Sequence, residues 1–235
     1  LDELHSLYVD QWDWEKVIIS AERTIDALYN CVKLIYQALL NTEYLVCEHY
    51  PILSPFLPKA IHFITSEELL QRYPNQTAKE RENSICKEYG AVFISGIGGT
   101  LSNGEVHDVR APDYDDWTTH APTKEAPNHC GLNGDLLIWY APLQKAVEIS
   151  SMGIRVDKSA LLKQLEITNH LDWQQFTYHN AIVQDQLPLT IGGGIGQSRL
   201  CMLLLHKRHI GEVQASVWDE QMIEDCRQKG IHILQ

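Results

Sequence analysis

Alternating and helical spacings of apolar residues divide the chain into strands and helices. Residues 9–15 alternate after Asp10, so that Gln11, Asp13 and Glu15 fall on one face of a predicted strand and two tryptophans fall on the other. Residues 20–48 carry apolar side chains at steps of three and four, which predicts a long amphipathic helix. The chain therefore opens with a strand that has one acidic face, followed by a helix.

The remainder of the chain reads as short strands and capped helices. Thr65 with Glu68 and Thr77 with Glu80 have the spacing of capping boxes, and each pair predicts the start of a helix. Apolar runs predict strands over residues 61–64, 91–97, 106–111 (after a turn at 102–104), 135–140 and 145–151, and helices over 158–165, 173–183 and 196–207. Strands joined mostly by hairpins, with helices set apart, indicate an α+β fold on an antiparallel sheet, and residues 1–235 form one predicted domain.

Composition and charge narrow the possible functions. Hydrophobic residues make up 44% and charged residues 21% of the 235 positions, which is typical of a globular protein. The net charge of −12 disfavours nucleic acid as a partner and favours a small charged substrate. No apolar run is long enough to span a membrane, and no secretory signal is evident. The six scattered cysteines fit buried, reduced thiols in a cytoplasmic protein.

Two carboxylates lie on the predicted hairpin of residues 135–151. A turn centred between Ala141 and Pro142 would place Asp135 directly opposite Glu148. Facing carboxylates repel each other, so a cation such as Mg²⁺ with a nucleotide phosphate would relieve the conflict. An exposed acidic hairpin without a ligand is the other interpretation.

The second strand of this hairpin continues into Gly153 and Arg155. Gly153 permits a β-bulge that could re-aim the residues after it. The Arg155 guanidinium could then bind a carboxylate with two parallel hydrogen bonds. A strand that carries a surface arginine is the simpler interpretation of this segment alone.

A glycine cluster at residues 192–196 precedes a predicted helix that carries Arg199. Glycines allow close approach of a ligand and positive φ, and a helix N-terminus favours anions. The P-loop signature is absent, and no βαβ unit supports a dinucleotide-binding fingerprint. Arg199 could contact a nucleotide. A flexible turn before a buried helix is the alternative.

A polar loop over residues 113–128 follows Arg110. Residues 110–117, which run into this loop, hold three carboxylates and one arginine beside a proline. Loops next to a sheet often carry binding groups. A solvated acidic turn explains the same composition.

Together these segments resemble the asparagine synthetase A family, the aspartate–ammonia ligases. The matching stretches occur in family order over essentially the whole chain: residues 9–15 (VDQWDWE), 110–117 (RAPDYDDW), 131–135 (GLNGD), 150–156 (SSMGIRV) and 190–200 (TIGGGIGQSRL). The resemblance implies the catalytic fold of class II aminoacyl-tRNA synthetases of the aspartyl type, a homodimer, and the formation of asparagine from L-aspartate, ATP and ammonia through a β-aspartyl-adenylate.

The resemblance also implies a role for each matching residue. The family pattern implies that aspartate is bound by Gln11, Asp13, Asp115, Ser151 and Arg155. ATP is contacted by Arg110, Glu148, Gly194, Gly196 and Arg199, and Mg²⁺ is held by Asp135 and Glu148. Arg110 and Asp115 are the residues implied in catalysis, Asp115 as a group that orients ammonia or accepts its proton.

Two departures keep other functions open. The chain begins with Leu1, and nothing in it matches the family's N-terminal segment, so we expect that this segment is missing. A class II synthetase domain acting on tRNA is one alternative, which the acidic charge disfavours. A non-catalytic truncated paralogue that serves as a binding subunit is the other, and the intact polar residues argue against it.

Overall fold

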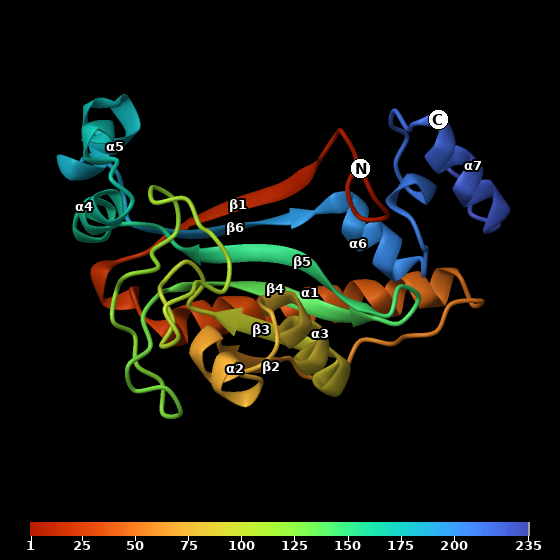
Figure 1. Cartoon of the computed structure of the whole chain (residues 1–235), viewed down its shortest axis with the longest axis horizontal. Coiled ribbons are helices and arrows are strands. Elements are labelled where there is room, and N and C mark those ends of the chain that lie inside the picture. Colours follow the sequence, from red (N-terminus) through yellow and green to blue (C-terminus); the bar gives the residue numbers. More distant parts are fainter. Residues whose placement is uncertain (235) are drawn as a thin grey trace.

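The fold is a six-stranded sheet with strand order β1-β6-β5-β4-β3-β2, described by a computed structural model over residues 1–234 (Figure 1). All neighbouring strands are antiparallel except β2 and β3. The strands are β1 Gln11–Val17, β2 His62–Thr65, β3 Ala91–Ser95, β4 Asn133–Tyr140, β5 Lys145–Ile154 and β6 Thr190–Gly196. The α-helices are α1 Ile25–His49, α2 Ser66–Arg72, α3 Ala78–Tyr89, α4 Lys158–Ile167, α5 Thr177–Val183, α6 Gln197–Leu204 and α7 Glu220–Gln228. This confirms the predicted α+β class.

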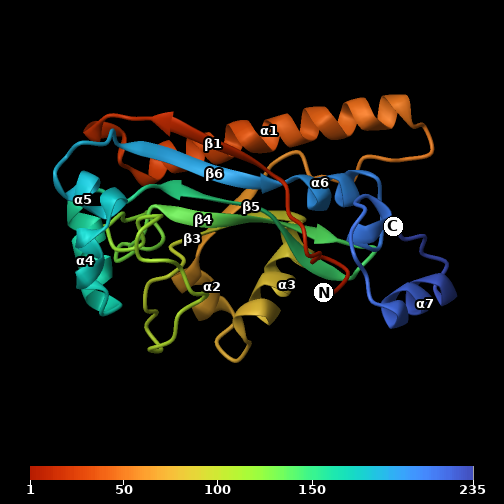
Figure 2. The same cartoon turned by 90° about the horizontal axis from the view of Figure 1, so that it is seen from above.

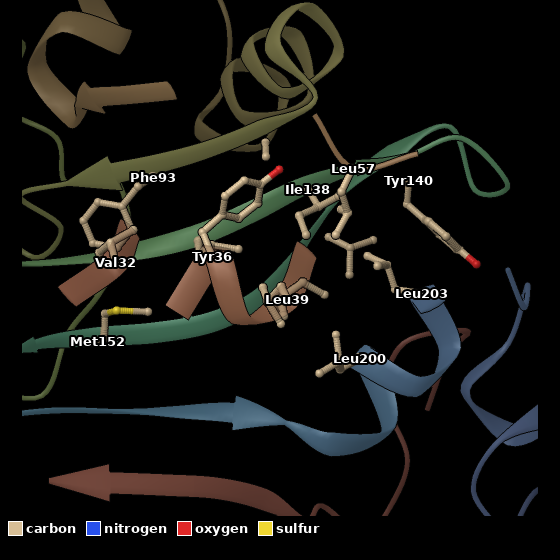
Figure 3. Close-up of a cluster of buried hydrophobic side chains, with 14 of the residues drawn as sticks. Val32, Tyr36, Leu39, Leu57, Phe93, Ile138, Tyr140, Met152, Leu200 and Leu203 are labelled. Atoms are coloured by element: carbon tan, nitrogen blue, oxygen red, sulfur yellow. The ribbon is translucent and has the colours of Figure 1, made fainter. Parts of the chain in front are cut away.

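Helices cover both faces of the sheet. Helix α1 lies along one face, and α2 and α3 lie along the other (Figure 2). Side chains of α1 such as Val32 and Tyr36 pack against Phe93 of β3 and Met152 of β5 (Figure 3). Each such side chain that is fully buried contributes roughly 1.5–3 kcal/mol. This α1 layer is the main hydrophobic core.

Two smaller clusters lie outside the main core. Along β3, Val92 and Ile94 alternate with Phe93 and face the opposite side, where they pack with α2 and α3. Helices α4 and α5 form a third cluster around Leu161 and Leu165 at one end of the sheet, while α7 lies at the other end (Figure 1). Part of the α2/α3 face, over β1, β6 and β5, is left for polar side chains.

The capping predictions are confirmed. The Thr65 hydroxyl accepts a hydrogen bond from Glu68 N at 3.1 Å, and the Thr77 hydroxyl accepts one from Glu80 N at 3.3 Å. The long helix forms as α1 but begins at Ile25, behind a short 3₁₀ turn at Ser20–Glu22. The helix predicted over residues 173–183 is instead a 3₁₀ turn, Leu171–Gln175, followed by α5.

The strand predicted over residues 106–111 is wrong. Residues 96–132 form a long loop with isolated bridges, among them Thr100 to Val106. The apolar residues of the predicted strand, Val106 and Val109, are 40% and 77% exposed, so the segment has no face to bury against a sheet.

The cysteine prediction is confirmed in part. Within residues 1–234 the six cysteines are free thiols. Cys86 and Cys226 are buried, but Cys130 and Cys201 are exposed, so burial does not hold for those two. Over the same residues, every helix is too short or too polar to cross a bilayer.

Candidate active site

Polar side chains from several elements gather in a cavity of about 450 Å³ on the face of the sheet that α1 does not cover. Strands β1, β6 and β5 lie side by side beneath it (Figure 1). Most predicted site residues line it: Gln11, Asp13, Arg110, Asp115, Glu148, Ser151, Gly194, Gly196 and Arg199. The other two, Asp135 and Arg155, are ion-paired to Arg110 and Asp115. The fold thus brings together residues that are far apart in the sequence.

The acidic face of β1 lies across the glycine cluster. Asp13 is opposite Gly194 in the antiparallel pairing of β1 with β6. A Cβ atom on Gly194 would lie 2.7 Å from Asp13 Oδ1, so only glycine leaves room for this carboxylate. The cluster is therefore part of strand β6, with no positive φ, rather than a flexible turn.

The β4–β5 hairpin differs from the predicted register. Asp135 pairs with Ser151, and Glu148 pairs with Leu137. The turn is longer than expected, because Tyr140 pairs with Lys145. A bulge opposite the Leu136/Leu137 step shifts the register further. The direct pairing of Asp135 with Glu148 is therefore wrong.

The bulge nevertheless keeps the functional groups on one face. Arg155 follows Glu148 by an odd number of positions, so a regular strand would send them to opposite faces. The extra residue at the bulge restores a common face. Asp135 and Glu148 become diagonal neighbours across the hairpin, a geometry with Cα atoms about 7–8 Å apart.

Gly153 has a different role from the predicted one. The bulge lies nearer Ile149, not at Gly153. A Cβ atom on Gly153 would lie 2.8 Å from Asp115 Cγ. Gly153 therefore makes room for the Asp115 carboxyl to pack against β5.

Asp135 and Glu148 form an acidic pair with one arginine. Asp135 Oδ2 accepts from Arg110 Nη2, while Asp135 Oδ1 is buried with no hydrogen-bond partner in the described residues. Burial raises the pKa of Asp135, although Arg110 opposes the shift. Burial and then the Asp135 charge raise the pKa of Glu148 to about 6. Within residues 1–234 Arg110 is the one cation ion-paired to these two carboxylates, and Arg199 acts on Glu148 without forming an ion pair, so a bound metal ion would relieve the remaining repulsion.

Asp115 and Arg155 form a buried ion pair at the end of the cavity away from Glu148. Arg155 Nη1 donates to Asp115 Oδ1, and both side chains are at most 8% exposed. Arg155 Nη2 also donates to the Tyr114 hydroxyl at 3.0 Å. Burial raises the pKa of Asp115 to about 6, and the attraction of Arg155 opposes the rise.

Glu15 binds a second edge of the Arg155 guanidinium. Arg155 Nε donates to Glu15 Oε1 at 2.7 Å, and Nη2 lies 2.6 Å from the same oxygen. The Glu15 side chain is 48% exposed, unlike Asp115 at 5%. Glu15 is therefore the exchangeable partner, and a substrate carboxylate could take its place on Arg155 Nε and Nη2.

Arg199 lies at the end of the cavity opposite Asp115. It lies in the first turn of α6, and its Nη1 donates to the Glu148 carbonyl oxygen at 3.2 Å. Arg199 Nη2 lies 2.9 Å from His5 Nε2. Residues 4–10 thus cross the cavity beside Arg199, the residue predicted to contact ATP.

The sequence prediction missed several residues of this site. Glu15 could have been found, since it shares the acidic face of β1 with Gln11 and Asp13. Tyr114 and His5 carry no comparable signal, because only the folded chain brings them to Arg155 and Arg199.

Comparison with solved structures defines the class of fold. The chain resembles an aspartyl-tRNA synthetase from Entamoeba histolytica with a TM-score of 0.62 and 14% identity, covering 91% of this chain and 44% of that one. An asparaginyl-tRNA synthetase from the same organism, in complex with asparaginyl-adenylate, gives a TM-score of 0.58 and 18% identity, covering 89% and 47%. The fold is that of a class II synthetase catalytic domain, as predicted.

Comparison of sequences gives the family. The aspartate–ammonia ligase family model matches residues 1–230. The aspartate–ammonia ligase of Parabacteroides distasonis is 56% identical over 234 residues, and that of Pediococcus pentosaceus is 55% identical. The chain belongs to the aspartate–ammonia ligase family. It spans about two thirds of the length of these relatives, 67% and 66%.

Proposed function

We propose that this chain serves the reaction of L-aspartate, ATP and ammonia to L-asparagine, AMP and pyrophosphate. One observation carries the proposal: the cavity has two chemically different ends along β1. Asp115 lines one end, with Arg155 and Glu15 ion-paired behind it, and Glu148 with Arg199 forms the other. An amino acid at the first end would present its side-chain carboxylate toward a nucleotide at the second.

The aspartate end offers both signs of charge. Asp13 and Asp115 suit the α-ammonium group of aspartate, and Gln11 and Ser151 supply neutral polar contacts. Arg155 suits a carboxylate once Glu15 has moved away. In this proposal the substrate replaces an internal ion pair with an equivalent one, so that no charge is left buried alone.

The nucleotide end fits a magnesium ion. Asp135 presents a buried oxygen without a hydrogen-bond partner, and Glu148 lies diagonally across the hairpin. Within residues 1–234 no group of three or more acidic, histidine or cysteine side chains could hold a metal alone, so phosphate and water would complete the shell. Mg²⁺ bound by this pair would neutralise phosphate charge. Arg199, with Gly194 and Gly196 beneath, would contact the nucleotide.

The chemistry has two displacements. First, a β-carboxylate oxygen of aspartate attacks the α-phosphorus of ATP, the bond to the β-phosphate breaks, and pyrophosphate leaves. Arg110, held by Asp135, would offset the charge that develops on the α-phosphate. The product is β-aspartyl-adenylate.

In the second displacement, ammonia attacks the activated acyl carbon and AMP leaves with the carbon–oxygen bond electrons. The nitrogen must lose one proton. Asp115 suits the role of acceptor, because its pKa of about 6 lies near neutrality. Within this proposal the chain forms one catalytic domain and assembles as a homodimer in the cytoplasm.

The test is AMP formation by the purified chain with aspartate, Mg·ATP and ammonium, with each component omitted in turn. We expect AMP only when all are present. AMP formation that depends on tRNA instead of ammonia would replace the proposal with the synthetase alternative. Failure to bind ATP would favour a non-catalytic binding subunit.

A further inference from the structure

The loop that carries Asp115 is held from outside the cavity by one fully buried amide. Gln164 lies on α4 and has no exposed surface. Its Oε1 accepts from Trp117 N at 2.8 Å and from the Thr118 hydroxyl at 3.3 Å. Its Nε2 donates to the carbonyl oxygens of Pro112 and Asp115 at 2.9 and 3.1 Å. One side chain thus bonds to the backbone on both sides of Asp115.

This arrangement uses the whole capacity of an amide. A glutamine side chain has two donors and an oxygen that accepts twice, and each of these positions is filled here. An apolar replacement would leave buried backbone groups without partners. A glutamate would face two carbonyl oxygens with a carboxylate. The position therefore requires glutamine chemistry and not only its volume.

Gln164 belongs to a unit distinct from the main core. Leu161 and Leu165, its neighbours on α4, pack in the separate α4/α5 cluster. From α5, His179 Nε2 lies 2.9 Å from Asp113 Oδ2, at the start of the same loop. Helices α4 and α5 thus pack behind residues 112–118, and Gln164 makes the most hydrogen bonds between α4 and this segment.

From the sheet side the backbone beside Asp115 is held on β5, because Asp116 N donates to the Ile154 carbonyl oxygen at 2.9 Å and Val156 N donates to the Tyr114 carbonyl oxygen at 3.0 Å. Asp115 itself bridges to Arg155 and packs on Gly153, and Gln164 supplies the contacts from the α4 side. A shift of the Asp115 backbone would move the carboxyl away from the Arg155 guanidinium and from the substrate end. A misplacement of about 1 Å can lower a rate by about 100-fold.

We propose that Gln164 is a positioning residue that sets the place of the Asp115 carboxyl in the active site. The inference rests on the proposed function for its kinetic consequence. Its structural consequence, the environment of Asp115, is independent of turnover.

The test compares Gln164→Met, which keeps the volume and removes the hydrogen bonds, with Leu161→Ala. Leu161→Ala loosens the same cluster and leaves the hydrogen bonds of Gln164 in place. In the full chain we expect Gln164→Met to lower kcat/KM for aspartate by about 100-fold with ATP affinity within twofold. Leu161→Ala should keep kcat/KM within threefold at a matched fraction folded. An equal kinetic loss in both variants would overturn the proposal.

A second measurement separates this inference from the proposed function. The titration of Asp115 can be followed by NMR of its carboxyl carbon. The signal that is lost in Asp115→Asn is assigned to Asp115. The charged groups that face Asp115 are Arg155 and, farther away, Arg110 and Asp135. We expect Gln164→Met to move the Asp115 midpoint and Leu161→Ala to leave it unchanged. An unchanged midpoint in Gln164→Met would refute the positioning role even if the chain forms no AMP.

Discussion

Replacing Asp115 with asparagine should make the fold more stable while it removes activity. Asp115 is 4% exposed, and burial is the largest influence on its carboxyl. Its pKa rises from 3.8 to about 6 even though Arg155 lies beside it. The ionised group therefore opposes folding, and a neutral isostere removes that opposition.

The pKa shift of Asp115 sets the magnitude and the sign of the stability change expected for Asp115→Asn. Each pKa unit corresponds to about 1.4 kcal/mol, so a rise from 3.8 to about 6 amounts to roughly 3 kcal/mol. The folded state binds this proton more tightly than the unfolded state. The stability that Asp115 contributes is therefore highest below pH 3.8, falls as the pH rises, and levels off above about pH 6. Asp115→Asn should gain less than about 1 kcal/mol at pH 4 and roughly 3 kcal/mol at pH 8.

The assay is urea unfolding, followed by tryptophan fluorescence, at pH 4, 6 and 8. Asp172→Asn is the matched control, because it removes the same charge from an exposed position. A variant that is less stable than the parent at pH 8 would show that the Arg155 pair outweighs the cost of burial. A gain that does not change with pH would exclude ionisation of Asp115 as its source.

Three further perturbations address other parts of the site. Asp135→Asn should raise the Mg²⁺ concentration for half-maximal AMP formation by about 10–100-fold, and an unchanged Mg²⁺ dependence would remove the proposed metal pair. Glu15→Gln should lower the aspartate KM about two- to fivefold, because an exposed partner of Arg155 worth ~0.2–1 kcal/mol no longer competes; a raised KM would mean that Glu15 itself contacts substrate. Gly153→Ala should cost about 1–3 kcal/mol in urea unfolding, since its Cβ would lie 2.8 Å from Asp115 Cγ; full stability would show that the loop can move away.

Local patterns were enough to predict much of the fold. The acidic alternation of β1 and the capping boxes at Thr65 and Thr77 act over a few residues, and the structure contains them as predicted. The failure at residues 106–111 has a physical cause. A hairpin turn at residues 102–104 gives a partner strand only if a sheet is present to bury its apolar residues, and Val109 is 77% exposed.

The candidate site needed more than local patterns. The motifs identify which residues gather in the cavity, but not the contacts among them. The register of Asp135 with Ser151 depends on the length of one turn and on one bulge, neither of which is visible in the alternation. Gln164 is indistinguishable in the sequence from any polar residue on a helix, because its partners lie about fifty residues away.

Asp115, Asp135 and Glu148 share one property: burial raises the pKa of each. A fold selected for stability alone would replace such groups or pair each with its own cation. Here Arg155 is shared between Asp115 and Glu15, and Arg110 is shared between Asp135 and Asp108, so carboxylates outnumber cations at both ends of the cavity. The ligands of the proposed reaction supply the missing positive charge, an ammonium group at one end and Mg²⁺ at the other. The excess of carboxylates lowers the stability of the ligand-free fold, and the same excess favours binding of the positively charged groups of the ligands. A substitution that removes the Asp115 charge should therefore raise stability and lower activity.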